Sequence, residues 1–589
     1  MSNDSESSED SSASRDSLKS SGSRSRIGPK KAARIAAGED RKKGSGKAAG
    51  KATGEATSKA SGAASGKASG LDPVNESGET PFLQSRSERG SSGGAKAPRA
   101  NEGNTLRDSQ GMASRKLALE TLIKIEKDGA YANLALSAGF ERQQLSEKDR
   151  AFVTAIVQGV MRNQNLIDQK IQTVSKEPLS KMPPLLRNLL RMAFFQLEYL
   201  SETPQHAVLD TSNKLARALG HEGLVRYTNG VLRGYLRKKE KSEPDKSLPP
   251  FSESESSPSD ALSVKYSLPA WLIEKWIEFY GIVETLALLD WSQKEPGLTV
   301  RISEVSVEPQ TMLDIMNKKG FAARVGRLVP ACLIFEGKDG GKSFRGSPQK
   351  LPGFDEGFFV VQDEAAAFVS LVVAPEKGET IVDLCAAPGG KAVHLAEMLD
   401  NTGRVIAVDK HESRLKLVKD ARLKLGLKNL ETVSADGRNF SLKKPADRVL
   451  LDAPCSGTGV INRRTDIRTN RKKEDIDELN SLQKELLANA AKLVKPGGVI
   501  VYSTCSLEPE ENIQVIEWFL REHPEFHGSS LLPFLSPEIQ DSWFSSENEA
   551  SLPNVSKRAA AENGYIQLIP TRHAVAGFFV CRLQRQLQP

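Results

Sequence analysis

Two cysteines follow predicted strands and are flanked by small or hydroxyl-bearing residues. Cys455 lies in LDAPCSGTG, and Cys505 lies in YSTCSLEPEEN. A buried cysteine in a reducing compartment is usually a small apolar filler, whereas a thiolate is a strong nucleophile. Because adjacent strands lie about 4.8 Å apart, thiols at two neighbouring strand ends can converge over one pocket. The pair therefore predicts a functional site with thiol chemistry.

Three aspartates also lie at or near the ends of predicted strands in this region. Asp383 precedes the loop CAAPGGK, Asp409 ends the strand GRVIAVD, and Asp436 lies in SADG. A carboxylate at Asp409 can accept both hydroxyls of a ribose, and Asp436 is placed to receive an adenine amino group. A single aspartate at a strand end is usually a turn or N-cap residue. Three at successive strand ends predict an adenosine-containing ligand.

The loop between the first of these strands and its helix consists of small residues and one lysine. Its two glycines allow close approach of a ligand, and the following helix presents free amides. It is neither GxGxxG nor a P-loop, which disfavours dinucleotides and nucleoside triphosphates. Lys391 is expected to hold the loop or the neighbouring carboxylates, and His394 is expected on the helix surface. We expect the ligand to contact Cys385, Ala386, Ala387, Pro388, Gly389, Gly390 and Lys391.

Strands and helices alternate through residues 351–589. Apolar strands such as TIVDLC, GRVIAVD and ADRVLLD are separated by amphipathic helices such as SRLKLVKDARLKL. This pattern predicts an α/β, Rossmann-like domain with a mostly parallel sheet and helices on both faces. The late strands YIQLIP and AGFFVCRLQ are expected to close the sheet as an edge hairpin. Ligands of such sheets bind at the carboxyl ends of the strands, where the candidate residues lie.

Four other segments precede this domain. Residues 1–110 form a low-complexity arm with roughly ten net positive charges in 11–70, and we expect it to be disordered. Residues 112–240 show apolar spacings of three and four, as in LLRNLLRMAFFQLEYL, and predict an all-helical bundle. A Ser- and Pro-rich linker is expected at 241–262, and a small α+β subdomain at 263–350.

Composition excludes several classes of protein. The five cysteines are widely spaced, with no CxxC pair and no nearby histidine, so neither a disulfide framework nor a metal site is expected. No apolar run reaches the length of a membrane span, and the first residues lack a signal-peptide layout. We expect a cytoplasmic monomer that uses no metal and no membrane. Most of the net charge of +7 belongs to the arm, which could hold polyanions through counterion release.

The motifs also resemble a known family. DLCAAPGGK, VDK, SADG, LDAPCSGTGV and YSTCSLEPEEN are similar, in order and spacing, to the AdoMet-dependent RNA 5-methylcytosine methyltransferases. The helical segment resembles the NusB-like RNA-binding domain in RAFVTAIVQGVMR, PQHAVLD and YTNGVLR. Such a bundle joined to such a catalytic domain is the arrangement of bacterial enzymes that methylate cytosine C5 in small-subunit (16S) rRNA. The resemblance implies S-adenosyl-L-methionine (AdoMet) as cofactor and RNA, most directly rRNA, as partner.

The resemblance implies a role for each thiol. Cys505 would add to C6 of the cytosine, and Cys455 would assist the final elimination as a base or release group. Asp452 would contact the N3/N4 edge of the base and would also lie at the cofactor site. From the chemistry alone the two cysteines could exchange roles, since DNA cytosine-C5 methyltransferases use the Pro-Cys thiol as nucleophile.

An arginine-rich segment, NRRTDIRTNRKK, follows the Pro-Cys loop. It offers Arg463, Arg464 and Arg468 to phosphates or to a flipped target base, although a charge run is normally a solvated face. Two alternatives remain open: a tRNA-directed enzyme with the same chemistry, and an RNA-binding adaptor that carries an inactive methyltransferase fold. The intact thiols and cofactor loop favour an active enzyme.

Overall fold

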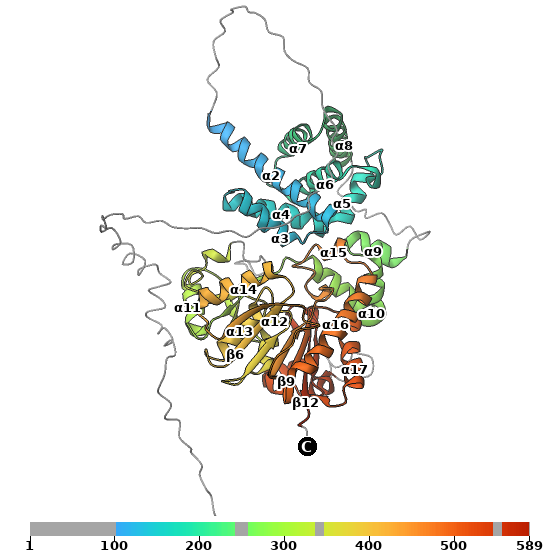
Figure 1. Ribbon diagram of the computed structural model, residues 1–589. Helices are drawn as coiled ribbons and strands as arrows, with labels where there is room; N and C mark the ends of the chain where they lie inside the picture. The colour runs from blue at the N-terminus through green and yellow to red at the C-terminus, as the bar shows by residue number, and fades with distance from the viewer. Residues whose placement is uncertain (1–101, 242–256, 336–346, 546–556, 588–589) are drawn as a thin grey trace, which may run out of the picture.

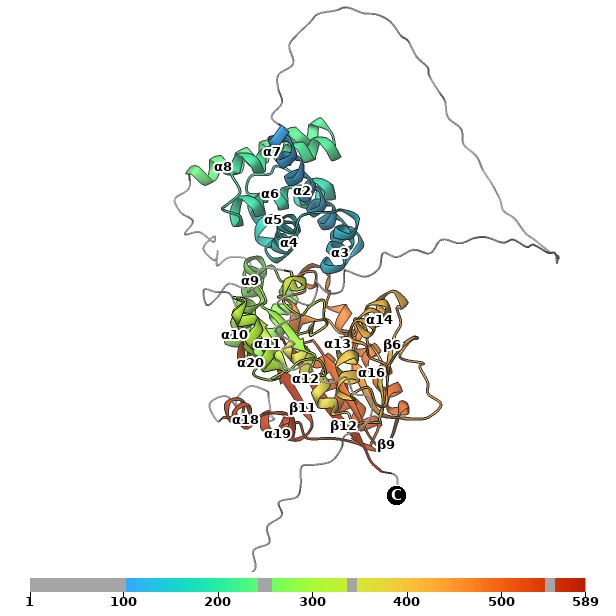
Figure 2. The ribbon, with the colours of Figure 1, turned by 90° about the vertical axis from the view of Figure 1, so that its left-hand side faces the viewer.

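The helical part of the chain is stacked on one end of an α/β body (Figures 1 and 2). The structure, a computed structural model, describes residues 102–241, 257–335, 347–545 and 557–587. Most of the basic arm predicted at 1–110, most of the predicted linker, and the glycine-rich segment EGKDGGKSFRG lie outside the described residues.

The bundle is all-helical, as predicted, and its first helix begins before the expected start at residue 112. Its apolar spacing is explained by burial: Leu189, Leu190, Ala193 and Phe194 of one helix are all inaccessible to solvent. The side chain of Ser146 caps another helix by accepting the Asp149 amide. The elements are α2 (Glu102–Asp128), α3 (Ala132–Arg142), α4 (Glu147–Arg162), α5 (Gln164–Gln172), η2 (Leu179–Lys181), α6 (Pro184–Tyr199), α7 (Gln205–Leu219) and α8 (Glu222–Lys241).

A small α+β unit follows, with a four-stranded antiparallel sheet in the order β2-β3-β1-β4. Its elements are α9 (Pro258–Tyr266), α10 (Ala270–Gln293), β1 (Leu298–Ile302), α11 (Pro309–Lys318), β2 (Ala323–Val325), β3 (Cys332–Phe335), η3 (Pro348–Lys350) and β4 (Phe359–Val361).

Two details of this unit differ from expectation. Helix α9 begins inside the stretch expected to be linker, because Ser257 and Asp260 form a capping box; serine and proline occur both in linkers and at helix starts. Strand β4 pairs with β1, although its residues were assigned to the next domain. A strand of three residues is too short to show the alternation by which strands are identified.

The last part of the chain contains an eight-stranded sheet in the order β10-β12-β9-β8-β5-β6-β7, with β11 also paired to β12. Strands β5 to β9 run parallel, which confirms the predicted mostly parallel sheet. The predicted hairpin of β11 and β12 is present, but β12 is not an edge, since β9 lies on one side of it and β10 and β11 on the other. The strands are β5 (Thr380–Asp383), β6 (Arg404–Asp409), β7 (Leu430–Ser434), β8 (Ala446–Asp452), β9 (Val494–Thr504), β10 (Phe526–Gly528), β11 (Tyr565–Leu568) and β12 (Phe578–Arg585).

Helices cover both faces of this sheet, as the apolar strands require. Residues of α12 (Glu364–Val373), α13 (Gly390–Met398) and α14 (Glu412–Leu425) form a core with Ile381 and Val405 on one face. Residues of α16 (Glu474–Leu493) and α17 (Ile513–Glu522) form a second core with Val382 and Ile406 on the other. Successive strand residues thus enter opposite cores. The remaining short elements are η4 (Thr458–Val460), α15 (Ile467–Asn470), η5 (Pro509–Glu511), η6 (Leu532–Phe534), α18 (Pro537–Trp543), α19 (Lys557–Glu562) and α20 (Pro570–His573).

Candidate active site

The two candidate thiols meet at the carboxyl ends of β8 and β9. These strands are parallel neighbours, and Asp452 is in register with Ser503, so the loops that follow them leave the sheet side by side. The Sγ atoms of Cys455 and Cys505 lie 3.4 Å apart. Both residues are partly buried, and both thiols are free. The predicted convergence of the two loops is confirmed.

The surroundings of the two thiols are electrostatically different. A hydrogen bond from Cys455 lowers the pKa of Cys505, and Lys391 and Arg464 act in the same direction, against burial and Asp452. The contact with Cys505 raises the pKa of Cys455, and burial and Glu511 raise it further. Cys505 is therefore the thiol that ionises more readily, and the thiolate is the nucleophilic form.

A buried glutamate that sequence reasoning did not identify joins the two thiol loops. Oε1 of Glu511 accepts the amide of Ser456 at 2.8 Å, and Oε2 accepts the hydroxyls of Ser456 and Ser506 at 2.5 Å each. Gln483 donates to Oε1 at 3.1 Å. The available signal was a serine after each cysteine, in PCS and TCS, with glutamates in LEPEEN. Glutamates at a helix start normally lie on the surface, which concealed this role.

Further hydrogen bonds hold the backbones of these loops. Arg471 donates to the carbonyls of Cys455 and Ser456 at 3.1 and 3.0 Å. The amide of Gly459 donates to the carbonyl of Cys505 at 3.0 Å. Both thiols thus lie on backbone that is fixed from several sides, which limits the motion of their sulfur atoms.

A lysine and an aspartate form an ion pair beside the thiols. Nζ of Lys391 donates to Asp452 at 2.7 Å, and Ser503 donates to the other carboxylate oxygen at 2.8 Å. Burial opposes the charge on the lysine, yet Asp452 and then Asp383 raise the pKa of Lys391 above its ordinary value. The expected contact of Lys391 with a neighbouring carboxylate is confirmed, and the lysine stays cationic.

The loop from Cys385 to Lys391 depends on one glycine conformation. Gly389 has φ +107°, and a Cβ atom there would lie 2.8 Å from the side chain of Val418. Glycine alone adopts this backbone without strain, and no larger residue has room. Helix α13 begins at the next residue, Gly390, so its first amides are free to meet a ligand at this loop.

The three strand-end aspartates have different partners. Asp383 is only 1% exposed, and among the described residues no side-chain donor meets its carboxylate. Burial, and then Asp452, raise the pKa of Asp383 to about 7. Asp409 accepts the amides of Ala387 and His411 at 3.2 and 2.9 Å, and so shapes the glycine loop from the next strand.

Asp436 is the most open of the three carboxylates. It accepts from the guanidinium of Arg438 at 2.7 Å, and this contact lowers the pKa of Asp436 to about 2. Asp436 is therefore ionised. Its carboxylate can accept a hydrogen bond from a second donor, such as an amino group, besides the one from Arg438.

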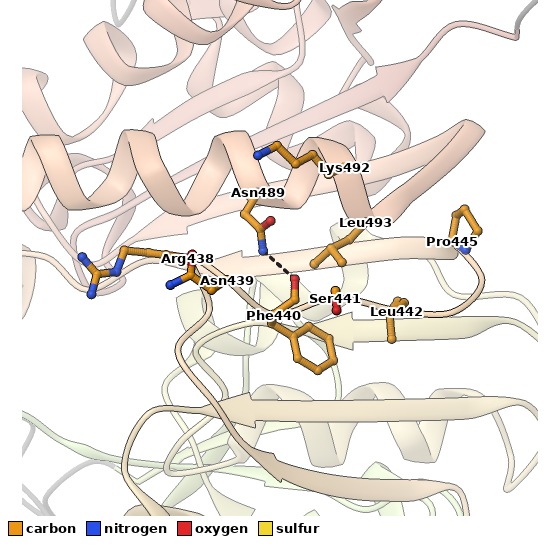
Figure 3. A pocket seen from close by; sticks show the side chains of 9 residues that line it. All are labelled: Arg438, Asn439, Phe440, Ser441, Leu442, Pro445, Asn489, Lys492 and Leu493. Atoms are coloured by element: carbon orange, nitrogen blue, oxygen red, sulfur yellow. Dashed lines mark hydrogen bonds between the residues drawn. The ribbon is translucent and has the colours of Figure 1, made fainter.

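A cavity of about 340 Å³ is lined by Arg438 and by residues that include neither thiol (Figure 3). It runs along the loop between β7 and β8 under the end of α16, where Asn489 donates to the carbonyl of Phe440 at 2.9 Å. None of its lining residues is among the predicted site residues. They are Arg438, Asn439, Phe440, Ser441, Leu442, Pro445, Asn489, Lys492 and Leu493.

Two of the three candidate RNA-binding arginines are partly exposed and already have partners in the chain. Arg463 donates to Asp363 at 2.8 Å. The guanidinium carbon of Arg464 lies 4.7 Å from the ring centroid of Tyr131, a residue of the helical bundle. Arg464 also forms an ion pair with Asp466 at 3.3 Å. Both arginines thus connect the segment after the Pro-Cys loop to other parts of the chain.

Two basic residues are buried where the sequence predicted exposure. Arg468 is 3% exposed and donates to the carbonyls of Tyr266 and Ser292, so the prediction that it meets RNA is wrong. His394 is 3% exposed within α13, and burial lowers its pKa well below the ordinary value, so its predicted surface position is also wrong. For Arg468, the partners of the buried guanidinium lie far away in the sequence.

Known proteins similar to this chain identify its family. Residues 370–584 match the family described as "16S rRNA methyltransferase RsmB/F", residues 112–237 match the NusB family, and residues 268–339 match an RsmF/B-like ferredoxin-like domain. A "Probable ribosomal RNA small subunit methyltransferase B" of Bacillus subtilis is 32% identical over 475 residues, which span 80% of this chain and 98% of that protein. The chain belongs to the RsmB/F methyltransferase family.

Further relatives agree with this assignment. "Ribosomal RNA small subunit methyltransferase B" of Shewanella oneidensis is 32% identical over 80% of this chain and 99% of its own length. The crystal structure of PH0851 aligns with a TM-score of 0.65 at 28% identity, over 80% of this chain and 99% of that one. This RsmB/F-family protein is an AdoMet-dependent methyltransferase with a NusB-family, RNA-binding bundle. Within the part of the chain that the structure describes, no helix has the length and apolar character of a membrane span.

The residues at the strand ends fit AdoMet. Its ribose hydroxyls and its amino groups are donors, and the site offers the carboxylates of Asp383, Asp409 and Asp436. The glycine conformation at Gly389 and the free amides of α13 leave room for a ligand to approach the backbone. The buried carboxylate of Asp383, which lacks a side-chain donor, is the clearest sign of a missing partner in this region.

Proposed function

We propose that this RsmB/F-family protein transfers a methyl group from AdoMet to C5 of a cytosine in small-subunit rRNA, with Cys505 as nucleophile. The observation that carries the proposal is the 3.4 Å contact between two free thiols, in which Cys505 has the lowered pKa. The names of the relatives, which are small-subunit rRNA methyltransferases, support the choice of small-subunit rRNA.

The proposed reaction begins at Cys505. C5 of cytosine is a weak nucleophile, so its electron density must rise before it can accept a methyl group. The thiolate of Cys505 forms a bond to C6, and the electron pair of the C5=C6 double bond becomes available at C5. When bound, AdoMet supplies an electrophilic methyl group on its sulfonium. The cytosine must be unstacked to reach this site.

Cys455 is proposed to complete the reaction. While Cys505 is a thiolate, the contact between the thiols keeps Cys455 protonated. Once the sulfur of Cys505 is bonded to C6 that charge is gone, and Cys455 can lose its proton to solvent and act as a base. It then takes the proton from C5, the C–H electron pair re-forms the C5=C6 bond, and the bond from C6 to Cys505 breaks.

The remaining roles follow from position. We assign the AdoMet site to the loop from Cys385 to Lys391 together with Asp409, Asp436 and Asp452. Asp452 lies between this loop and the thiols, paired with Lys391, and is proposed to contact the N3/N4 edge of the base. We further propose that the protein acts as a monomer in the cytoplasm.

Transfer of labelled methyl from AdoMet tests the proposal. Unmodified small-subunit rRNA and bulk tRNA are offered separately to the wild type and to Cys505→Ala and Cys455→Ala. We expect 5-methylcytosine in rRNA, loss of transfer with Cys505→Ala, and accumulation of a protein–RNA adduct with Cys455→Ala. Label in tRNA alone would show that tRNA is the substrate. An adduct in Cys505→Ala would show that Cys455 is the nucleophile. AdoMet binding without methyl transfer to either RNA would indicate an RNA-binding adaptor.

A further inference from the structure

One aromatic side chain of the helical bundle lies against the catalytic domain next to the thiols. Tyr131 precedes α3, is 48% exposed, and places its ring centroid 4.7 Å from the guanidinium carbon of Arg464. Nε of Arg464 is buried without a hydrogen-bond partner among the described residues. The ring of Tyr131 and the carboxylate of Asp466 thus orient this guanidinium.

The bundle touches the same segment at three other points. Thr465 donates to the side chain of Gln158 at 2.6 Å. Arg162 donates to the carbonyl of Asn462 at 3.2 Å. Asn470 donates to the carbonyl of Gly129, next to α3, at 3.4 Å. Figure 1 shows α15, which ends this segment, at the end of the body that faces the bundle. The bundle is therefore docked along the whole stretch of residues 462–470.

This stretch continues directly into the active site. The next residue, Arg471, donates to the carbonyls of Cys455 and Ser456. Arg464 is held next to the loop of the nucleophile, because its amide donates to the carbonyl of Val460 at 2.9 Å and the adjacent Gly459 donates to the carbonyl of Cys505 at 3.0 Å. Its charge accordingly lowers the pKa of Cys505. The other groups that face this thiol are Cys455 and Lys391, which act in the same direction, and Asp452, which acts against them. Lys391 comes from the side of the glycine loop, whereas Arg464 comes from the side of the bundle.

We propose that Tyr131 is a positioning residue of the active site, whose ring holds the guanidinium of Arg464 beside Cys505. The bundle then has a second role besides RNA binding, because it completes the surroundings of the nucleophile. This inference rests on the proposed role of Cys505. A cation held over an aromatic ring is stabilised in one orientation, and without the ring Arg464 can turn toward Asp466 and solvent, away from the sulfur.

The test measures the reactivity of Cys505 in the full-length protein without RNA or AdoMet. Alkylation by iodoacetamide is followed by peptide mass spectrometry from about pH 5 to about pH 9, since the thiolate is the reacting form. We expect Tyr131→Ala to slow alkylation of Cys505 near neutral pH by about two- to fivefold and to move its pH midpoint upward. Arg464→Gln should do so at least as strongly, and adding Tyr131→Ala to it should change nothing further.

Controls separate the ring from the fold. Tyr131→Phe keeps the ring and should match the wild type, whereas Tyr131→Leu keeps apolar bulk without a π face and should match Tyr131→Ala. Tyr199→Ala removes a comparably exposed tyrosine, 41% exposed and stacked on Phe195 within the bundle, and should leave the midpoint unchanged.

Several results would overturn the inference. A midpoint unchanged in both Tyr131→Ala and Tyr131→Leu, with Arg464→Gln shifted, would remove Tyr131 from the site. Slower alkylation at every pH with the same midpoint would indicate altered access and not altered charge. A wild type in which Cys505 reacts no more readily than Cys455 would instead count against the proposed nucleophile, independently of the tyrosine variants.

Discussion

The Sγ atom of Cys505 lies 3.4 Å from that of Cys455, and the two thiols have pKa values shifted in opposite directions. The largest cause for both is the contact between the two sulfurs, which lowers the pKa of Cys505 and raises that of Cys455. Lys391 and Arg464 also lower the pKa of Cys505, whereas burial and the carboxylate of Glu511 raise that of Cys455. Geometry alone would allow either sulfur to attack a base, and the charges around the pair distinguish them.

The short distance between the sulfurs predicts reversible oxidation. Diamide should remove two hydrogens from the pair and form a Cys455–Cys505 disulfide, because one thiolate stands next to the other thiol. We expect methyl transfer to be lost and then restored by dithiothreitol, with the bridged peptide seen by mass spectrometry. In Cys455→Ala the bridge cannot form, so diamide should not block formation of the protein–RNA adduct that this variant accumulates. A block of adduct formation that dithiothreitol reverses in this variant would contradict the prediction.

Glu511 predicts a strong dependence of the site on one buried carboxylate. In Glu511→Gln an amide NH₂ replaces one acceptor oxygen, and it would face the hydroxyls of Ser456 and Ser506 or the amide of Ser456. We expect the free energy of unfolding to fall by about 1–3 kcal/mol. We expect the rate of methyl transfer to fall by about tenfold or more. Thermal unfolding and label incorporation measure the two effects. Glu510→Gln, at a partly exposed partner of Lys275, is the matched control.

Alanine substitutions at two glycines with similar φ angles distinguish the cost of backbone strain from the cost of side-chain crowding at the cofactor loop. Gly389 and Gly378 have φ +107° and +90°, but a Cβ atom would meet Val418 at 2.8 Å only at Gly389 and nothing within 4 Å at Gly378. Gly378→Ala should cost about 1–2 kcal/mol from backbone strain and leave AdoMet affinity unchanged. Gly389→Ala should cost more and weaken AdoMet binding in calorimetry. Equal effects of both variants on affinity would show that the crowding at Val418 is unimportant.

The raised pKa of Asp383 predicts a pH-dependent stability. Its pKa of about 7 in the folded protein exceeds the ordinary value of 3.8, so its contribution to stability is fully present below about pH 4 and is lost as the pH rises through about 7. Asp383→Asn removes the buried charge and should therefore raise the melting temperature relative to wild type at about pH 8 but hardly at about pH 5. Differential scanning fluorimetry without AdoMet measures the difference.

Asp436 provides the control, because its pKa is shifted in the opposite direction from that of Asp383. Its lowered pKa of about 2, caused by Arg438, means that its contribution is present above about pH 4 and lost as the pH falls through about 2. Asp436→Asn should thus lower stability at both pH values. A melting temperature of Asp383→Asn that follows the same pattern would rule out the linkage argued for Asp383.

The amino-acid sequence by itself determined the order of strands and helices in the catalytic domain and the place of both thiols at strand ends. These features depend on local patterns, since a strand buried on both faces must be a continuous apolar run. The same patterns identified the loop from Cys385 to Lys391 and the helical bundle. They did not identify β4 and β10, whose three residues each are too short for a pattern.

The tertiary structure alone decided which polar residues are buried and what they touch. Arg464 and Arg468 lie in one basic segment, yet one meets Tyr131 from the bundle and the other is buried against the carbonyls of Tyr266 and Ser292. Glu511 is buried although its neighbours in LEPEEN are typical of a surface helix start. Burial and charge at such positions are set by residues from other parts of the chain, and each thiol's pKa shift follows first from its contact with the other thiol, which only the folded chain brings about.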